Sequence, residues 1–141
     1  MREIKFRAKH FSGIIHEWFY GVPVPTDFGS YFMPEVYDNR LSYGKLYATP
    51  IDKDTIGQFT GLYDKNGNEI YEGDILQYGN FGTKIVVEFK HGMFCYKTKI
   101  FSEYFGFGAN DNFTFQPKNA DNNFEVVGNI YDNKELLDKE I

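Results

Sequence analysis

The stretch that decides the fold is TGLYDKNGNEIYEGD, residues 60–74. At its centre, Asn66-Gly67 is a strong short-range signal for a β-hairpin. A type I′ turn needs positive φ at both central positions, and asparagine and glycine tolerate it. Such a turn pairs Tyr63 with Ile70, so that apolar side chains meet across the two strands.

A two-residue loop also fixes the register of these strands. It sets Lys65 opposite Asn68, Asp64 opposite Glu69, Tyr63 opposite Ile70 and Leu62 opposite Tyr71. Asp64 and Glu69 then form an unfavourable like-charge pair. A longer loop that offsets the two carboxylates therefore remains an alternative.

Strand patterns recur on both sides of this hairpin. We expect strands at Ile4–Ala8, Ile14–Tyr20, Ile56–Tyr63, Ile75–Tyr78, Lys84–Lys90, Met93–Lys97 and Phe124–Tyr131. Ser12-Gly13 is expected to turn the first hairpin and His91-Gly92 a later one, while Glu72-Gly73-Asp74 marks a bend. Gly128, inside the last strand, predicts a bulge or a close backbone approach.

Two segments lack regular periodicity, and the chain ends in a helix signal. Prolines interrupt Val24–Asp54, which we interpret as a long, partly structured insertion. Phe101–Asn123 is interpreted as a loop whose aromatic side chains dock onto the body. Asp132 followed three residues later by Glu135 fits a capping box, and predicts a short helix from about Asn133.

The composition agrees with a β protein. Aromatic residues make up 19% of the 141 residues, which favours strands. We predict one domain over 1–141, with N-terminal strands and an irregular insertion in 1–55, a β core in 56–131 and a terminal helix in 132–141. The fold class is all-β (mostly β), a small barrel or twisted antiparallel sheet, with a Src-homology-3-like topology as the preferred form.

Charge and cysteine content narrow the function classes. The net charge of −5 supplies no field that attracts phosphate backbones, which disfavours nucleic acid as a partner. Cys95 is the single cysteine, so no intrachain disulfide forms. Because the N-terminus has no apolar run like a signal peptide and no stretch resembles a membrane span, we expect a cytoplasmic protein.

Three blocks, in this order, resemble the YopX family of phage and prophage proteins. They are Arg2–Ala8, Thr60–Ile75, and Glu125–Tyr131 with Leu136-Leu137. The family often continues the first block with tryptophan, where this chain has Lys9-His10 and carries Trp18 further on. The resemblance implies a mostly β fold and an origin in mobile bacterial elements, hence the host cytoplasm. It brings no established activity and no catalytic residues.

Asp64-x-Asn66-x-Asn68 imitates the start of a calcium-binding loop, whose oxygen ligands recur on alternate residues. The imitation fails further on, because Glu69 stands where glycine is needed and Ile75 stands where a bidentate glutamate is needed. We therefore interpret these residues as turn chemistry.

The spacing of the histidines and of Cys95 does not favour a zinc site or a catalytic thiol. His91 and Cys95 lie four residues apart on a predicted strand pair, without a second cysteine, and His10 and His16 are isolated. Cys95 sits in an apolar run that should bury it in the core. No metal site is predicted.

Glu69, Glu72 and Asp74 form a carboxylate cluster that could serve acid/base catalysis, but acidic residues commonly flank turns. Gly106-Phe107-Gly108 lacks the third glycine of a dinucleotide site, since Asp111 occupies that position. We therefore predict no catalytic and no cofactor-binding residues.

The leading hypothesis is a non-enzymatic binding or assembly module, with self-association as its simplest version. Its partner is then another protein or a second copy, and no membrane is expected. A nucleic-acid-binding accessory protein is the alternative, since exposed aromatics stack bases and Arg2, Lys5 and Arg7 share the presumed wet face of the first strand. An enzyme that uses the carboxylate cluster is the second alternative. The binding residues stay unassigned.

Overall fold

The computed structural model describes residues 3–26, 29–36, 46–78, 83–90, 92–97, 104–106 and 124–138. Within these residues, all strand pairing is antiparallel, with one short 3-10 helix and one short α-helix. The predicted mostly β fold is confirmed, and the described strands form sheets and not a closed barrel. The chain divides into two compact units, Met1–Gln58 and Phe59–Ile141.

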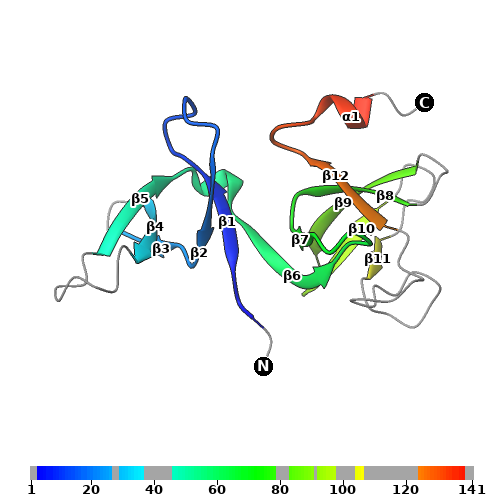
Figure 1. Cartoon of the computed structure of the whole chain (residues 1–141), viewed down its shortest axis with the longest axis horizontal. Helices are drawn as coiled ribbons and strands as arrows, with labels where there is room; N and C mark the ends of the chain where they lie inside the picture. The colour runs from blue at the N-terminus through cyan, green and yellow to red at the C-terminus, as the bar shows by residue number, and fades with distance from the viewer. Residues whose placement is uncertain are drawn as a thin grey trace. The chain divides into compact units, whose positions relative to one another are not determined.

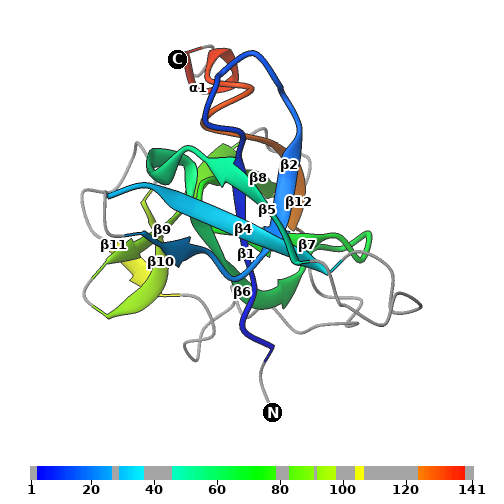
Figure 2. The same ribbon diagram turned by 90° about the vertical axis from the view of Figure 1, so that its left-hand side faces the viewer.

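The first unit opens with a hairpin. Its elements are β1 (Phe6–Lys9), β2 (Trp18–Gly21), β3 (Val24–Pro25), β4 (Tyr31–Val36), β5 (Leu46–Ile51) and the 3-10 helix η1 (Lys53–Thr55). β1 and β2 pair from Phe6 with Gly21 to Lys9 with Trp18. The connecting segment extends past the ends of both strands (Figures 1 and 2). It turns at Gly13, which has φ of +68°, as predicted.

The predicted irregular insertion is more regular than we expected. β3, β4 and β5 form a three-stranded sheet, in which β4 and β5 lie side by side over their whole length (Figure 2). The prolines that argued against strands, Pro34 and Pro50, sit inside β4 and β5. β3 reaches only Tyr31 and Phe32 of β4, so Pro34 needs a partner on one side alone. Pro50 lies near the end of β5, and its carbonyl accepts the Phe11 N–H at 3.1 Å.

The core of the first unit lies between the β1–β2 hairpin and this sheet. Ala8, Met33 and Ile51 are buried at its centre, and further apolar side chains pack against them. A bridge between His10 and Ile51 joins the end of β1 to β5. Side chains alternate along β1 and β2, so Ala8 and its cross-strand partner Phe19 share the core face.

The second unit is built on a five-stranded sheet. Its elements are the end of β6 (Gly57–Tyr63), β7 (Glu69–Tyr71), β8 (Asp74–Tyr78), β9 (Thr83–Lys90), β10 (Met93–Lys97), β11 (Tyr104–Gly106), β12 (Phe124–Asn129) and α1 (Glu135–Asp138). The sheet order is β11-β10-β9-β8-β12 (Figure 1). The predicted β9–β10 pair is confirmed, although His91 of its turn lies outside the described residues.

Part of the predicted loop at Phe101–Asn123 is a strand. Tyr104–Gly106 forms β11 and pairs with Cys95–Lys97 of β10. Phe105 and Tyr104 are favourable strand residues, but a three-residue strand is too short to show period-two alternation. The rest of that segment lies outside the described residues.

The hairpin of β6 and β7 has the longer loop, so the predicted type I′ register was wrong. The Gly67 N–H donates to the Asp64 carbonyl at 3.0 Å, and the Asp64 N–H donates to the Asn68 carbonyl at 2.8 Å. Gly67, with φ of +83°, supplies the left-handed residue that follows the turn. Glu69 consequently lies opposite Tyr63, and the Asp64–Glu69 charge clash is avoided.

The core of the second unit is built by the sheet and the β6–β7 hairpin. Its buried members are Ile70, Leu76, Ile85, Val87, Tyr96 and Phe124. Thr60 is buried beside it, donates to the Ile70 carbonyl at 2.8 Å and accepts the Leu62 N–H at 3.1 Å. These bonds satisfy the backbone where the register of β6 shifts between Phe59 and Tyr63.

Gly128 in β12 shows both features that the sequence predicted. The register with β8 shifts between Val126 and Gly128, which is a bulge. A Cβ atom at Gly128 would lie 2.6 Å from Oδ1 and 2.8 Å from Cβ of Asn133. Asn133 needs this position because its Oδ1 accepts the Asn129 N–H at 3.2 Å.

The terminal helix is shorter than predicted. It spans Glu135–Asp138 and so begins two residues later than the expected start at Asn133. Asp132, the proposed cap, accepts a hydrogen bond from the side-chain amide of Asn129 at 3.1 Å. The Asn133 side chain bonds the Asn129 N–H at the end of β12. The Asn133 carbonyl accepts the Leu136 N–H at 2.9 Å. Local turn bonds therefore replace the first helical turn.

Gly128→Ala should lower the free energy of unfolding by about 1–3 kcal/mol, because the new methyl group forces Asn133 out of place. Asn133→Gly removes all three atoms that crowd position 128. Adding Gly128→Ala to that variant should therefore cost much less. Urea denaturation of the four proteins in this double-mutant cycle measures the coupling, and additive losses would contradict the close-approach explanation.

Candidate functional site

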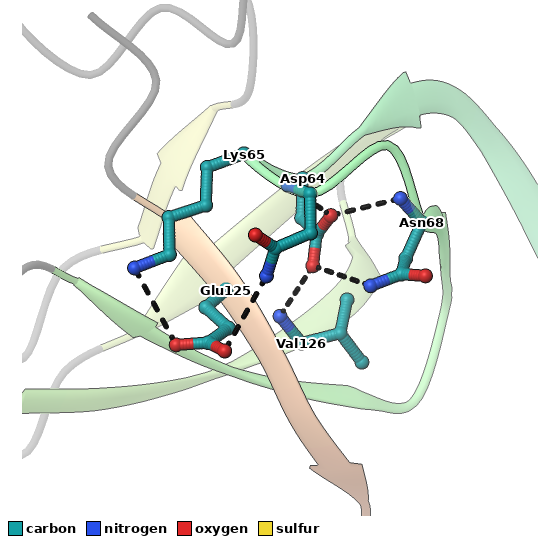
Figure 3. Close-up of polar contacts among 6 residues, drawn as sticks. Asp64, Lys65, Asn68, Glu125 and Val126 are labelled. Carbon is teal, nitrogen blue, oxygen red and sulfur yellow. Dashed lines mark hydrogen bonds and ion pairs between the residues drawn. The ribbon is translucent and has the colours of Figure 1, made fainter.

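The imitation calcium loop is a structural junction built on Asp64 (Figure 3). Asp64 is only 4% exposed. Its Oδ1 accepts the backbone N–H groups of Asn66 at 2.9 Å and Asn68 at 2.8 Å. Its Oδ2 accepts the Asn68 side-chain amide at 3.2 Å and the Val126 N–H at 2.9 Å. Four donors thus converge on one carboxylate.

The same loop covers the outer edge of β12. The Lys65 N–H donates to the Phe124 carbonyl at 2.9 Å, next to the bond from Val126 to Asp64. The side chains of the same segments form an ion pair exposed to solvent, in which Lys65 Nζ lies 3.5 Å from Glu125 Oε2 (Figure 3). Because β12 ends the order of its sheet, these contacts satisfy backbone groups that would otherwise be open to another chain.

The Asp64 carboxylate is arranged to stay ionised. Burial by itself raises the pKa of Asp64, but the N–H donors of Val126, Asn68 and Asn66 outweigh it and hold the pKa below its usual value. Each of the two carboxylate oxygens accepts from two N–H donors. The interpretation of Asp64, Asn66 and Asn68 as turn chemistry therefore agrees with the geometry.

Asp64→Asn should lower the free energy of unfolding by about 3 kcal/mol, because an amide cannot accept from both sides and leaves a buried N–H without an acceptor. Glu125→Gln is the matched control. It alters an exposed contact of the same loop and should cost less than about 1 kcal/mol. Urea denaturation at neutral pH compares the two, and equal losses would contradict the assignment.

The lowered pKa of Asp64 also predicts a pH dependence. A carboxyl whose folded pKa is depressed stabilises the fold fully above its unfolded pKa of about 3.9. That stability is lost as the pH falls through the folded pKa. Urea denaturation between about pH 2 and pH 7 should show a shallower acid loss in Asp64→Asn than in the parent chain. Parallel curves would refute the prediction.

The candidate catalytic carboxylates are engaged in the bend that the sequence predicted. Asp74 is 1% exposed, and its Oδ2 accepts the Tyr71 N–H at 2.7 Å. The Tyr71 hydroxyl donates to Glu69. At the bend itself, the Gly73 N–H donates to the Val87 carbonyl at 2.8 Å. Asp74 thus binds the backbone of Tyr71, and Glu69 binds its hydroxyl.

The sequence also offered metal and nucleotide candidates, of which only some lie in the described residues. Cys95 is buried, and burial raises the pKa of its thiol, as expected for a core residue. His91, Phe107 and Gly108 lie outside the described residues. Within the described part of the chain, no three His, Cys, Asp or Glu residues gather as a metal site would require.

The basic stripe of the first strand differs from the prediction. Arg7 was expected on a wet face, but it is only 7% exposed, and its guanidinium lies 4.5 Å from the ring centre of Trp18. Lys9 Nζ lies 5.6 Å from the same ring, and Lys5 Nζ lies 3.7 Å from Glu3. The Trp18 ring therefore contacts Arg7 and Lys9, which the alternation of β1 alone could not reveal.

The clearest candidate for a binding surface is the tip of the β1–β2 hairpin. Phe11, Ile14 and Ile15 are 70%, 81% and 42% exposed. The tip is ordered by its own polar groups, because His10 Nδ1 accepts the Ser12 N–H at 3.1 Å and the Ser12 Oγ accepts the Ile14 N–H at 3.3 Å. Apolar side chains are thus held outward on a locally bonded turn.

A second apolar feature continues from the hairpin along the chain. Tyr20, Val22 and Val24 alternate with partly buried residues and are 53%, 56% and 48% exposed. We call them the outward stripe. Positions of this kind are usually polar when one face of a sheet meets water. An apolar stripe here therefore points to a surface that another molecule covers.

A shallow hollow lies at the base of the same hairpin. Its volume is about 480 Å³, and it is lined by Phe6, Val22, Pro23, Tyr31, Lys53, Asp54 and Ile56. Most of this lining is apolar, and Lys53 and Asp54 place charges at the hollow. The first unit thus carries an apolar tip at one end of its hairpin and an apolar hollow at the other.

Sequence reasoning did not single out these surface residues. Ile14–Tyr20 was interpreted as a strand, whereas β2 begins only at Trp18 and the preceding residues form the tip. A signal was present, because Ile14-Ile15 directly follows the turn at Ser12-Gly13. Apolar residues that adjoin a turn are more exposed than those within a strand.

The chain is similar to known proteins both in sequence and in structure. The family model described as YopX protein matches residues 5–138. The crystal structure of protein EF1440 from Enterococcus faecalis is similar, with 25% sequence identity and a TM-score of 0.56, over 97% of this chain and 99% of that chain. A comparison with curated proteins gave no match. In the described residues, no helix has the length and hydropathy to cross a membrane.

Proposed function

Because the chain belongs to the YopX family, we propose that it is a non-enzymatic binding or assembly module of phage origin that works in the bacterial cytoplasm. Its partner is a protein, in the simplest case another copy of the chain. The phage origin and the cytoplasmic location rest on the family resemblance.

The observation that carries this proposal is the unequal distribution of exposed apolar side chains. Of the ten large hydrophobic residues exposed in the described part of the chain, seven belong to the first unit, namely Ile4, Phe11, Ile14, Ile15, Tyr20, Val22 and Val24. Isolated exposed apolar residues are normal, but a series on one hairpin and the residues that flank it is typical of an interaction site.

The free energy gained by burying these side chains is large enough for specific recognition. Fully burying a phenylalanine or isoleucine side chain contributes about 1.5–3 kcal/mol. Phe11 and Ile14 are mostly exposed, so a partner could gain most of that from each. The hydrogen bonds from Ser12 and Ile14 hold the tip in place, which lowers the entropy lost on binding.

Capture on the immobilised full chain tests the proposal. We expect a bacterial lysate containing the phage to yield a bound protein, identified by mass spectrometry, that the triple variant Phe11→Ser/Ile14→Ser/Ile15→Ser no longer retains. The matched control is Phe89→Ser/Met93→Ser/Tyr131→Ser, which removes three exposed apolar side chains from the second unit. This control should retain the protein.

Circular dichroism must show that both triple variants keep the β fold. If the parent chain and the tip variant retain the same proteins to the same extent, the binding surface is not the hairpin tip. If no protein is retained by the parent chain and it does not self-associate, the proposed function is wrong.

A further inference from the structure

We propose that two copies of this chain associate through the first unit, with their β2 strands antiparallel and the hairpin tip of each copy seated in the hollow of the other. This inference rests on the proposed binding function and names its partner as a second copy. It joins three features that the first unit presents together: an edge strand, an apolar tip and an apolar hollow.

The first of these features is the edge strand β2. β2 ends the order of its sheet among the described strands, with β1 as its neighbour on one side. Its sequence Trp-Phe-Tyr-Gly contains no charge and no proline, the devices that normally protect an edge from pairing. The edge of β12, by contrast, is covered by Asp64 and Lys65. The chain therefore protects one edge and leaves β2 suited to strand addition.

The antiparallel arrangement of the two β2 strands places the tip of each copy near the hollow of the other. In an isologous dimer, β2 faces β2 about a two-fold axis. The proposed register centres this axis between Phe19 and Tyr20, so that Trp18 lies opposite Gly21 of the second copy. Continuing this register sets Glu17 opposite Val22 and His16 opposite Pro23 of the second copy. Val22 and Pro23 line the hollow, so the tip residues that precede Glu17 arrive at its mouth.

The tip and the hollow match in size and polarity. A cavity of about 150 Å³ holds a benzene ring, and the hollow, at about 480 Å³, is larger. It can therefore accept the ring of Phe11 together with an isoleucine side chain. The outward stripe of Tyr20, Val22 and Val24 lies along the same contact, which extends the apolar area beyond the tip.

Charge favours the same arrangement. Glu17 is exposed at the start of β2, and Lys53 is exposed at the rim of the hollow. The register above brings Glu17 next to the hollow of the second copy, where Lys53 attracts it and Asp54 repels it. The arrangement therefore requires Glu17 to lie nearer to Lys53 than to Asp54. The two-fold axis makes this contact twice in each dimer, so a charge reversal acts twice.

Sedimentation equilibrium of the full chain over a concentration series measures the dimer. We expect Ile14→Asp and Val22→Asp each to raise the dimer dissociation constant at least about tenfold, because they place a charge in the apolar contact. Met93→Asp in the second unit, at a residue exposed to nearly the same extent as Val22, is the matched control and should leave the constant unchanged. Circular dichroism confirms the fold of each variant.

Charge exchange separates this arrangement from other dimers. Glu17→Lys and Lys53→Glu should each weaken the dimer, and the double variant should restore it, because the pair is reformed with reversed sign. A zero-length carbodiimide cross-link between Glu17 and Lys53 should also form in the parent chain. Mixing isotopically labelled and unlabelled protein shows by mass spectrometry whether the link joins two copies.

A strictly monomeric chain would overturn this inference, and so would a dimer unaffected by Ile14→Asp or by the charge reversals. A monomer that still captures another protein through its tip would overturn the self-association and leave the proposed function standing. A dimer that loses its cross-link and its affinity in the single variants and regains both in the double variant supports it.

Discussion

The second unit depends on the carboxylate of Asp64, which gathers four N–H donors from two segments far apart in the sequence. Three donors come from the hairpin loop and shape its turn. The fourth, Val126, comes from the last strand, so one side chain both closes the β6–β7 hairpin and fixes β12 against it. A buried anion is costly unless it is hydrogen-bonded, and this concentration of donors offsets that cost.

The Asp64 junction explains why residues that imitate a calcium loop stand at this position. Oxygen ligands on alternate residues suit a cation, but the same spacing lets one carboxylate accept the N–H groups of the next turn. Asn66 takes part through its backbone N–H, and Asn68 through its backbone N–H and its side-chain amide. The oxygen-rich sequence therefore specifies a turn and a strand contact, and the acidic character of the loop needs no metal ion.

The sequence predicted the local features well and the long-range ones poorly. The strands with clear alternation, the bulge at Gly128 and the turn chemistry at Asp64 follow from nearby residues alone. The hairpin register was wrong because a two-residue turn was preferred to the longer loop, which the Asp64 carboxylate closes by accepting from Asn66 and Asn68. The contact of Asp64 with Val126, 62 residues away, had no local signal. The sheet around Pro34 and Pro50 was missed because those prolines are tolerated only in the context of strand order. Arg7 was misplaced because its cover, Trp18, belongs to another strand.

Two edge strands that belong to different sheets, β12 and β2, differ in how their outer edges are covered. At β12, a loop supplies a carboxylate and an N–H to the outer edge, so backbone groups are satisfied within one molecule. At β2, the sequence offers aromatic residues, no charge and an apolar continuation at Val22 and Val24. A chain able to build an edge cover in one place has no stability reason to leave such an edge apolar in another. The difference is best explained if the second edge is covered by a partner.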